Sequence, residues 1–357
     1  MKSKIINFTI QTNISSEMKK YPAGTDAAVL IIFFNRPESL RLVFEQVRKS
    51  RPSRLFLYQD GPRGPEDMVG IEACREVVSD VDWECDVRKW YRKENHGCDP
   101  SQYESQKWAF TMTDKCIFLE DDDVPSLSFI PFCKEMLDRY EDDRRIFMIT
   151  GINYDERTEN IPYDYFFSTT FTISGWATWK SRFEKCDEAY SFLDDKYAVK
   201  MLGNMINRRK YQKEFLEMCR DHRASGKAYY ESLLHAAMFL SSALCVVPRV
   251  NMINNLGALG EGVHLSGSNR TMPRAYRRIF EMDRHELSFP LRHPEYMIED
   301  VEYKERMFRA QAWGHPYIKV ARSFEELFLC LRYGEFRKIG WSIKNRLGKW
   351  FGWHKYC

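Results

Sequence analysis

The sequence predicts an α/β fold with a mostly parallel central sheet flanked by helices. Strand-like and helix-like segments alternate along residues 28–123. Among the strand-like segments, residues 29–34 and 116–119 are short apolar runs, and an unbroken run such as 29–34 is typical of a strand buried on both faces. The chain has 357 residues, of which 44% are apolar and 15% aromatic, so it can form a large core. Intrinsic disorder and a small disulfide-stabilised fold are thereby excluded.

Each of the first four strand-like runs is followed by a segment whose apolar side chains recur at helical spacing. The predicted strands are residues 29–34, 55–58, 86–91, 116–119 and 146–150. The predicted helices are residues 38–49, 67–79, 100–113 and 129–140, followed by a mainly helical region over 184–244 with a break near Ser225 and Gly226. Parallel sheets of this kind bind ligands beyond the carboxyl ends of their strands.

No segment reaches the roughly 20 apolar residues that cross a bilayer. The first 25 residues also lack the apolar stretch of a secretory signal. The ten cysteines are scattered without a C-x-x-C pair, which buried reduced thiols explain better than zinc or disulfides do. We therefore expect a cytoplasmic protein, either free or peripheral on the inner face of the cell membrane.

We expect one catalytic domain over residues 27–300 and a helical, basic and aromatic extension over residues 301–357. Residues 336–357 contain several aromatic side chains, no acid and six basic residues, namely Arg337, Lys338, Lys344, Arg346, Lys349 and Lys355. This pattern fits a helix at the surface of an anionic membrane and equally a helix that docks on the body of the protein. With 54 basic and 51 acidic residues in the whole chain, the rest is slightly acidic, and we expect no nucleic-acid binding.

Four consecutive acids, residues 120–123, follow the predicted strand 116–119. Clustered carboxylates at the end of a buried strand are unfavourable unless a positive charge lies beside them. A divalent cation suits this position, because hard cations prefer carboxylate oxygens and leave positions open for substrate phosphates. A solvated acidic turn is the alternative. The position at the expected ligand-binding edge favours a metal site, while phosphate-loop, dinucleotide-binding and EF-hand patterns are absent.

Five segments, in chain order, resemble the GT-A-fold glycosyltransferases. The similarity is to the N-acetylglucosaminyltransferases of N-glycan antenna synthesis and to related bacterial nucleotide-diphospho-sugar transferases. The segments are residues 29–36, Gln59-Asp60, 118–122, Gly175-Trp176 and 248–257. Over residues 28–300, the resemblance implies a GT-A fold and an inverting transfer of a sugar from a nucleotide diphosphate, commonly UDP, to a saccharide hydroxyl.

The resemblance also implies roles for the matching residues. Arg36 would lie near the diphosphate, and Asp60 would accept a hydrogen bond from the uracil N–H. Asp122 would bind Mn²⁺ or Mg²⁺, while Glu120 and Asp121 would face the sugar and the ribose. Because the run is one acid longer than the family motif, Asp123 is a second candidate metal ligand.

Glu231 occupies the place of the family's catalytic base at the start of a helix. The family has Trp-Asp-Asp-Trp there, whereas this chain has Tyr230-Glu231-Ser232-Leu233. As a general base, Glu231 would deprotonate the acceptor hydroxyl. The alternative is a carboxylate that only interacts with the helix dipole.

Further polar residues have both a functional and a structural interpretation. Lys107 could contact phosphate or be an exposed helical lysine. His264, in a glycine-rich loop, could reach the diphosphate or the metal, or lie on the surface. The cluster of Arg274, Arg277 and Arg278 could meet an anionic acceptor or form a solvated helix face.

Two other functions compete with glycosyl transfer. A sugar-phosphate nucleotidyltransferase shares the parallel sheet and acidic metal ligands, but it usually has a glycine-rich basic loop where this chain has Phe34-Asn35-Arg36-Pro37. An inactive sugar- or membrane-binding module would not need all the carboxylates described above. If the tail binds membrane, the acceptor is expected to be a lipid-linked saccharide of a bacterial surface-polysaccharide pathway.

Overall fold

The computed structural model describes residues 20–257 and 269–341. Within these ranges the strands are β1 (Thr25–Phe33), β2 (Pro52–Gln59), β3 (Asp86–Tyr91), β4 (Lys115–Glu120), β5 (Asp123–Pro125), β6 (Ile146–Thr150), β7 (Tyr165–Ser168), β8 (Trp176–Trp179), β9 (Leu244–Pro248) and β10 (Ile253–Asn255). One sheet has the order β3-β2-β1-β4-β8-β6-β9-β7, and β5 pairs with β10 in a short antiparallel ribbon.

Most neighbouring strands of this sheet are parallel. β1 pairs in parallel with β2 and β4, β2 with β3, and β6 with β9. β8 is antiparallel to both of its neighbours, and β7 is antiparallel to β9. The predicted fold class is confirmed: this is a mixed α/β fold with a large, mostly parallel sheet, consistent with the expected GT-A, or nucleotide-diphospho-sugar transferase, fold.

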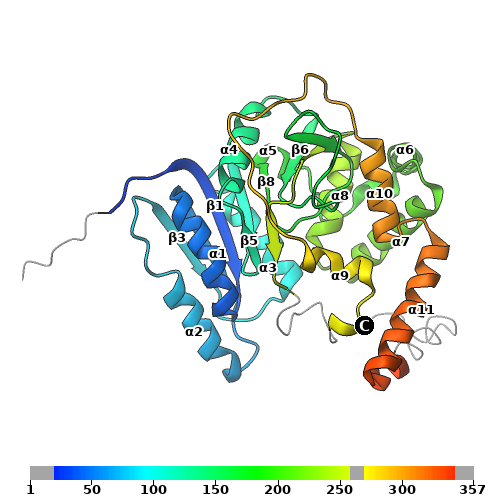
Figure 1. Ribbon diagram of the computed structural model, residues 1–357, viewed down its shortest axis with the longest axis horizontal. Coiled ribbons are helices and arrows are strands. Elements are labelled where there is room, and N and C mark those ends of the chain that lie inside the picture. Colours follow the sequence, from blue (N-terminus) through cyan, green and yellow to red (C-terminus); the bar gives the residue numbers. More distant parts are fainter. Residues whose placement is uncertain (1–19, 258–268, 342–357) are drawn as a thin grey trace, which may run out of the picture.

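Helices flank both faces of the sheet (Figure 1). They are α1 (Pro37–Ser50), α2 (Met68–Val77), α3 (Cys98–Ala109), α4 (Phe129–Arg139), α5 (Lys180–Phe183), α6 (Lys196–Ile206), α7 (Arg209–Ser225), α8 (Tyr230–Leu240), α9 (Arg274–Glu281), α10 (Val301–Gln311) and α11 (Pro316–Tyr333). Helices α1, α2 and α4 contribute to the core on one face, and α3, α6, α7, α8 and α10 to the core on the other.

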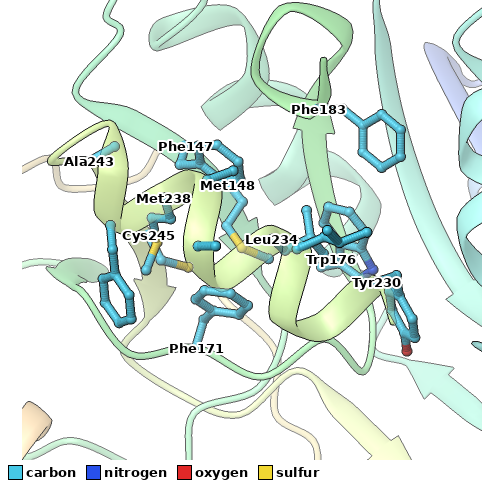
Figure 2. Close-up of a cluster of buried hydrophobic side chains, with 14 of the residues drawn as sticks. Phe147, Met148, Phe171, Trp176, Phe183, Tyr230, Leu234, Met238, Ala243 and Cys245 are labelled. Atoms are coloured by element: carbon cyan, nitrogen blue, oxygen red, sulfur yellow. The ribbon is translucent and has the colours of Figure 1, made fainter. Parts of the chain in front are cut away.

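Side chains that alternate along β1 supply both cores. Val29 and Ile31 belong to one apolar cluster, whereas Leu30 belongs to the other. This is the pattern expected of a strand covered on both faces, because successive side chains point in opposite directions. Figure 2 shows the second cluster around α8, where Leu234 packs among aromatic and sulfur-containing side chains and Tyr230 lies at the margin.

The predicted boundaries of β3 and β6 agree with the structure, and several others shift. β1 begins at Thr25, four residues earlier than predicted, and α3 begins at Cys98 rather than Pro100. Proline is tolerated there because the first turn of a helix does not use its N–H groups within the helix. The predicted break between helices is confirmed, because α7 ends at Ser225 and Gly226 adopts a left-handed φ of +68°.

The C-terminal extension differs in burial between its two helices. α10 begins at Val301 and inserts Tyr303, Met307 and Phe308 into the core, each at most 2% exposed. α11 leaves most of its apolar side chains exposed. The expected tail, residues 336–357, lies outside the described residues from position 342 onward. In the described part, no helix is long and apolar enough to span a membrane.

The described cysteines form no disulfide, as expected from their scattered positions. Six of the nine are buried, among them Cys116 and Cys245 in the sheet. Burial raises the pKa of both thiols, which keeps them protonated and unreactive.

Candidate functional site

The acidic run lies at the carboxyl edge of the parallel part of the sheet. The end of β1 aligns with the ends of both neighbours, with Ile32 opposite Tyr58 of β2 and Glu120 of β4. Just beyond β1, the N–H of Phe34 donates to Asp121 Oδ2 at 3.1 Å. The predicted convergence of strand ends at this edge is therefore confirmed.

Arg36 is the cation that the fold places against this run. Its Nη1 lies 2.8 Å from Asp122 Oδ2 and 3.6 Å from Asp121 Oδ1. Burial lowers the pKa of Arg36, but the charges of Asp121 and Asp122 more than offset this effect. The adjacent Pro37 starts α1 and restricts the backbone where Arg36 turns toward the run.

The run carries more negative charge than Arg36 can balance. Burial raises the pKa of Glu120, Asp121 and Asp123, and repulsion from neighbouring carboxylates adds to it. For Asp121 the pKa rises to about 7. Among the described residues, Arg36 is the one cation within ion-pair distance of the run. A further positive charge at this edge would stabilise the ionised carboxylates.

Asp123 differs from the rest of the run, because its carboxylate is turned into the protein. It is 1% exposed and accepts hydrogen bonds from the N–H groups of Glu120 and Gly175 and from the amide of Asn255. Gly175 has a φ of +63°, and a Cβ there would lie 2.5 Å from Ile253, so only glycine fits without strain. Asp123 thus fixes the ends of β8 and β10, and the geometry favours Asp122 as the metal ligand.

The start of α8 faces the same edge. Tyr230 is buried, and its hydroxyl lies 3.5 Å from Glu120 Oε1. The next residue, Glu231, is exposed, and its charge contributes to the raised pKa values of Glu120 and Tyr230. The structure therefore brings Glu231 close to the acidic run, as its predicted role requires.

A buried hydrogen-bond network holds this end of α8. Ser232 Oγ lies 2.6 Å from the hydroxyl of Tyr190 and 2.8 Å from Nδ1 of His222. The ring of His222 stacks on Tyr229 at 3.9 Å between centroids. These contacts connect α7 to the first turn of α8 and so restrict the position of Glu231.

Asp60 lies at the end of β2 and has an evident structural role. It is 7% exposed, and it accepts hydrogen bonds from the N–H groups of Gly61, His96 and Gly97 and from the side chain of Asn95. These bonds hold the turn between β3 and α3. The predicted contact with a nucleobase remains a prediction.

Known proteins give little independent information on this site. No protein-family model and no curated protein matches the chain. Similar solved structures include a cytidylyltransferase from Leptospira borgpetersenii, with 12% identity, 46% of this chain and 64% of that chain covered, and a TM-score of 0.29. A 4-diphosphocytidyl-2C-methyl-D-erythritol synthase from Anaerococcus prevotii has 14% identity, 45% and 76% coverage, and a TM-score of 0.28. An apo UDP-glucose pyrophosphorylase has 8% identity, 64% and 93% coverage, and a TM-score of 0.33.

These neighbours are enzymes of nucleotide and nucleotide-sugar chemistry. The match spans less than two thirds of the cytidylyltransferase. The activities in their names correspond to the nucleotidyltransferase alternative rather than to glycosyl transfer. At such low identities and TM-scores, the similarities carry no argument about the activity or substrate of this chain.

The position of Lys107 on α3 favours the alternative of an exposed helical lysine, and its predicted contact with phosphate stays a prediction. Lys107 is nine positions beyond Cys98, which is about 13 Å along the axis of α3. Cys98 lies near the run, whose charges contribute to its raised pKa after the larger effect of burial. Lys107 instead pairs with Glu188 at 2.8 Å. The other peripheral candidate, His264, lies outside the described residues.

Sequence reasoning missed the residues that position Arg36. Asp67, which is 3% exposed, accepts hydrogen bonds from the side chains of Asn35 and Arg63. The bond from Arg63 is the main cause that lowers the pKa of Asp67 to about 2. Asp67 therefore ties the segment beside Arg36 to the start of α2. No sequence pattern relates positions so far apart.

The donor set fits a cation that is shared with a substrate. Among the described residues, no three Asp, Glu, His or Cys side chains are grouped to hold a metal ion by themselves. Mg²⁺ is commonly bound through one or two carboxylates plus substrate phosphates and water. Asp122, beside the excess negative charge of the run, fits this arrangement, with the remaining ligands coming from a diphosphate and solvent.

Proposed function

We propose that this protein is a metal-dependent glycosyltransferase that moves a sugar from a nucleotide diphosphate donor to a saccharide hydroxyl. The observation that supports the proposal most is the pairing of two features at one edge of the sheet. An acidic run with surplus negative charge lies beside Arg36, and an exposed carboxylate, Glu231, is close enough to influence that run. UDP is the proposed nucleotide.

In this proposal the first half of the chain binds the donor. Arg36 is positioned to contact the diphosphate, and it would exchange part of its ion pair with Asp122 for phosphate oxygens. Asp122 would hold Mn²⁺ or Mg²⁺, which when bound offsets the negative charge of the departing nucleoside diphosphate. Glu120 and Asp121 are available to bind sugar and ribose hydroxyls, which are hydrogen-bond donors to carboxylates.

The second half of the chain supplies the base. Glu231 would accept the proton of the acceptor hydroxyl at a carboxylate oxygen as that hydroxyl attacks the sugar carbon. The fixed start of α8 supports this role, because a general base must be held within hydrogen-bond reach of the proton it removes. A saccharide or lipid-linked saccharide is the proposed acceptor.

A sugar-phosphate nucleotidyltransferase is the second candidate. A parallel sheet with an acidic run at its carboxyl edge suits that chemistry as well. The segment after β1 argues against a nucleotidyltransferase, which usually has a glycine-rich basic loop there. This chain has Phe34-Asn35-Arg36-Pro37 without a glycine, and the N–H of Phe34 already donates to Asp121. The two candidates release different products, so one experiment separates them.

The experiment incubates the protein with Mn²⁺ and either a panel of UDP-sugars or UTP with sugar 1-phosphates. Glycosyl transfer, or the slower hydrolysis of the donor by water, releases UDP from a UDP-sugar. Nucleotidyl transfer releases pyrophosphate from UTP. Pyrophosphate release without any UDP release would overturn the proposal in favour of the second candidate, and no turnover of either kind would favour a binding module.

A further inference from the structure

A cavity with charged residues in its lining is formed by α9, α10, α11 and residues 154–156, away from the acidic run. Its volume is about 790 Å³. Four arginines and four acids contribute to its lining. The positive and negative side chains of the lining are equal in number, but only some of them pair directly with one another.

Each acid of the cavity already has a donor. Asp155 pairs with Arg306, Glu156 with His285, Glu281 with Arg277, and Glu325 accepts from the backbone N–H of Arg274. All four acids therefore have a partner within the protein, but only Asp155 and Glu281 pair with an arginine. Of those two arginines, only Arg306 lines the cavity.

Arg322 is the most buried of the remaining arginines. It is 8% exposed, and its Nη2 donates to the backbone carbonyls of Arg309 and Ala310. Its Nη1 has no hydrogen-bond partner among the described residues. The guanidinium lies 4.6 Å from the ring centroid of Tyr276, which compensates its charge only in part. A buried guanidinium without a directly paired carboxylate is unfavourable, so an anion bound in the cavity would stabilise Arg322.

Arg278 and Arg274 complete the surplus of positive charge. Arg278 donates to the backbone carbonyls of Tyr154 and Asp155, which orients its guanidinium without neutralising it. Within the described residues, Arg274, Arg278 and Arg322 form no ion pair with any acid. Three guanidinium groups thus line one cavity without a direct ion pair. Only two acids of the lining, Glu156 and Glu325, are not paired with an arginine, which leaves one positive charge in excess.

We propose that this cavity binds a phosphate group carried by a ligand, with Arg274, Arg278 and Arg322 as its anion-binding residues. The planar guanidinium fork matches the oxygens of a phosphate, and a doubly charged phosphate balances clustered arginines better than a single carboxylate does. The site is separate from the acidic run, which lies near Gly257 and Phe280 on another side of α9. The inference therefore does not depend on the proposed function.

The test measures binding of inorganic phosphate by calorimetry in metal-free buffer to the full chain and to Arg274→Gln, Arg278→Gln and Arg322→Gln. Arg332→Gln on α11 is the matched control, because that arginine does not line the cavity. A parallel arm measures pelleting with phosphatidylcholine vesicles with and without phosphatidic acid. This arm separates a soluble phosphate ester from a lipid headgroup as the source of the phosphate.

We expect saturable phosphate binding that each cavity variant weakens by about tenfold or more, because each loses a charge-assisted contact, while the control binds as the parent does. Binding only to vesicles that contain phosphatidic acid, with the same loss in the variants, would support the site with a lipid phosphate as ligand. No binding in either arm, or equal binding in all variants, would overturn the proposal. If Arg322→Gln fails to fold, the exposed Arg274 and Arg278 decide the outcome.

Discussion

At the scale of single residues, Arg36 and Glu231 have different proposed roles in the candidate site, Arg36 as the contact to the diphosphate and Glu231 as the base. Arg36 partly balances the acidic run from one side, and Glu231 is exposed beside it from the start of α8. The two residues are far apart in sequence, so the site depends on the contact between the two halves of the chain. Their roles can be tested one side chain at a time.

Glu231→Gln should abolish most turnover and leave donor binding intact. The amide cannot accept the proton of an attacking hydroxyl, and loss of a general base typically costs about 10²–10⁴-fold in rate. We expect kcat to fall by about 10²-fold or more while the donor Kd, measured by titration, stays unchanged. Glu188→Gln, which removes an exposed carboxylate on another surface, is the control and should keep full activity. Full activity of Glu231→Gln would refute its role as base.

Asp122→Asn tests the metal assignment without an assay of activity. A cation that binds the native state and not the unfolded chain raises the melting temperature, because it stabilises the fold by RT ln(1 + c/Kd), where c is the free cation concentration. We expect Mn²⁺ with UDP to raise the Tm of the parent protein and to have little effect on the variant. Asp123→Asn is the control, because this carboxylate is turned into the protein toward Gly175 and Asn255, and it should keep the Mn²⁺ response. An equal Mn²⁺ response in the parent and in Asp122→Asn would contradict the assignment.

At the scale of secondary-structure elements, α8 links the core to the site. Leu234 and Met238 are buried in the cluster shown in Figure 2, while the first turn of the same helix carries Tyr230 and Glu231. A helix that is anchored in this way holds the exposed Glu231 in its first turn more firmly than a loop could. The network around Ser232 adds a second restraint at the point nearest the site.

Ser232→Ala should lower stability through this network. The variant removes the contacts of this hydroxyl with Tyr190, His222 and the backbone carbonyl of Tyr229, and it leaves the hydroxyl of Tyr190 without this partner. We expect the free energy of unfolding to fall by about 1–3 kcal/mol, measured by urea denaturation. Ser241→Ala, at the exposed end of the same helix, is the control, with an expected change within about 0.5 kcal/mol. Equal stability of the two variants would mean that the network contributes nothing.

Most helices and strands could be predicted from the sequence, because apolar periodicity follows from one-sided or two-sided burial. The predicted ranges of β3 and β6 agree with the observed ones. The short strands β5 and β10 were not predicted, because their three-residue ribbon exists only through pairing between distant segments. The aromatic segment before α5, residues 163–179, likewise contains two strands that were not predicted, β7 and β8. β8 lies between β4 and β6, whereas β7 pairs with β9 at the edge of the sheet.

At the scale of the whole molecule, the fold couples protonation of a half-buried histidine to stability. His235 on α8 stacks on Phe171 at 4.1 Å between ring centroids, and its Nδ1 donates to the backbone carbonyl of Glu231. Because that carbonyl is an acceptor, Nδ1 carries the hydrogen in this contact. Burial lowers the pKa of His235 to about 4, so the folded state favours the neutral ring.

The sign of the resulting pH dependence follows from this lowered pKa. Between about pH 6.5 and pH 4 the unfolded chain binds a proton at position 235 that the folded chain does not, so acid destabilises the fold. His235→Phe should remove this component. We expect the parent to lose about 2 kcal/mol relative to the variant between pH 7 and pH 4, measured by denaturation at each pH. Parallel pH profiles of the two proteins would contradict the prediction.

The sequence by itself determined the α/β class, the helix break at Gly226 and the acidic run at a strand end, because each of these follows from local periodicity or local backbone freedom. Only the tertiary structure decided which acid of the run is turned inward, and that Lys107 pairs with Glu188. It also decided that Arg36 is held by the segment around Asp67. The reason is physical: consecutive side chains of one charge look alike in a sequence, and their burial and partners are set by segments that the fold brings to them from elsewhere in the chain.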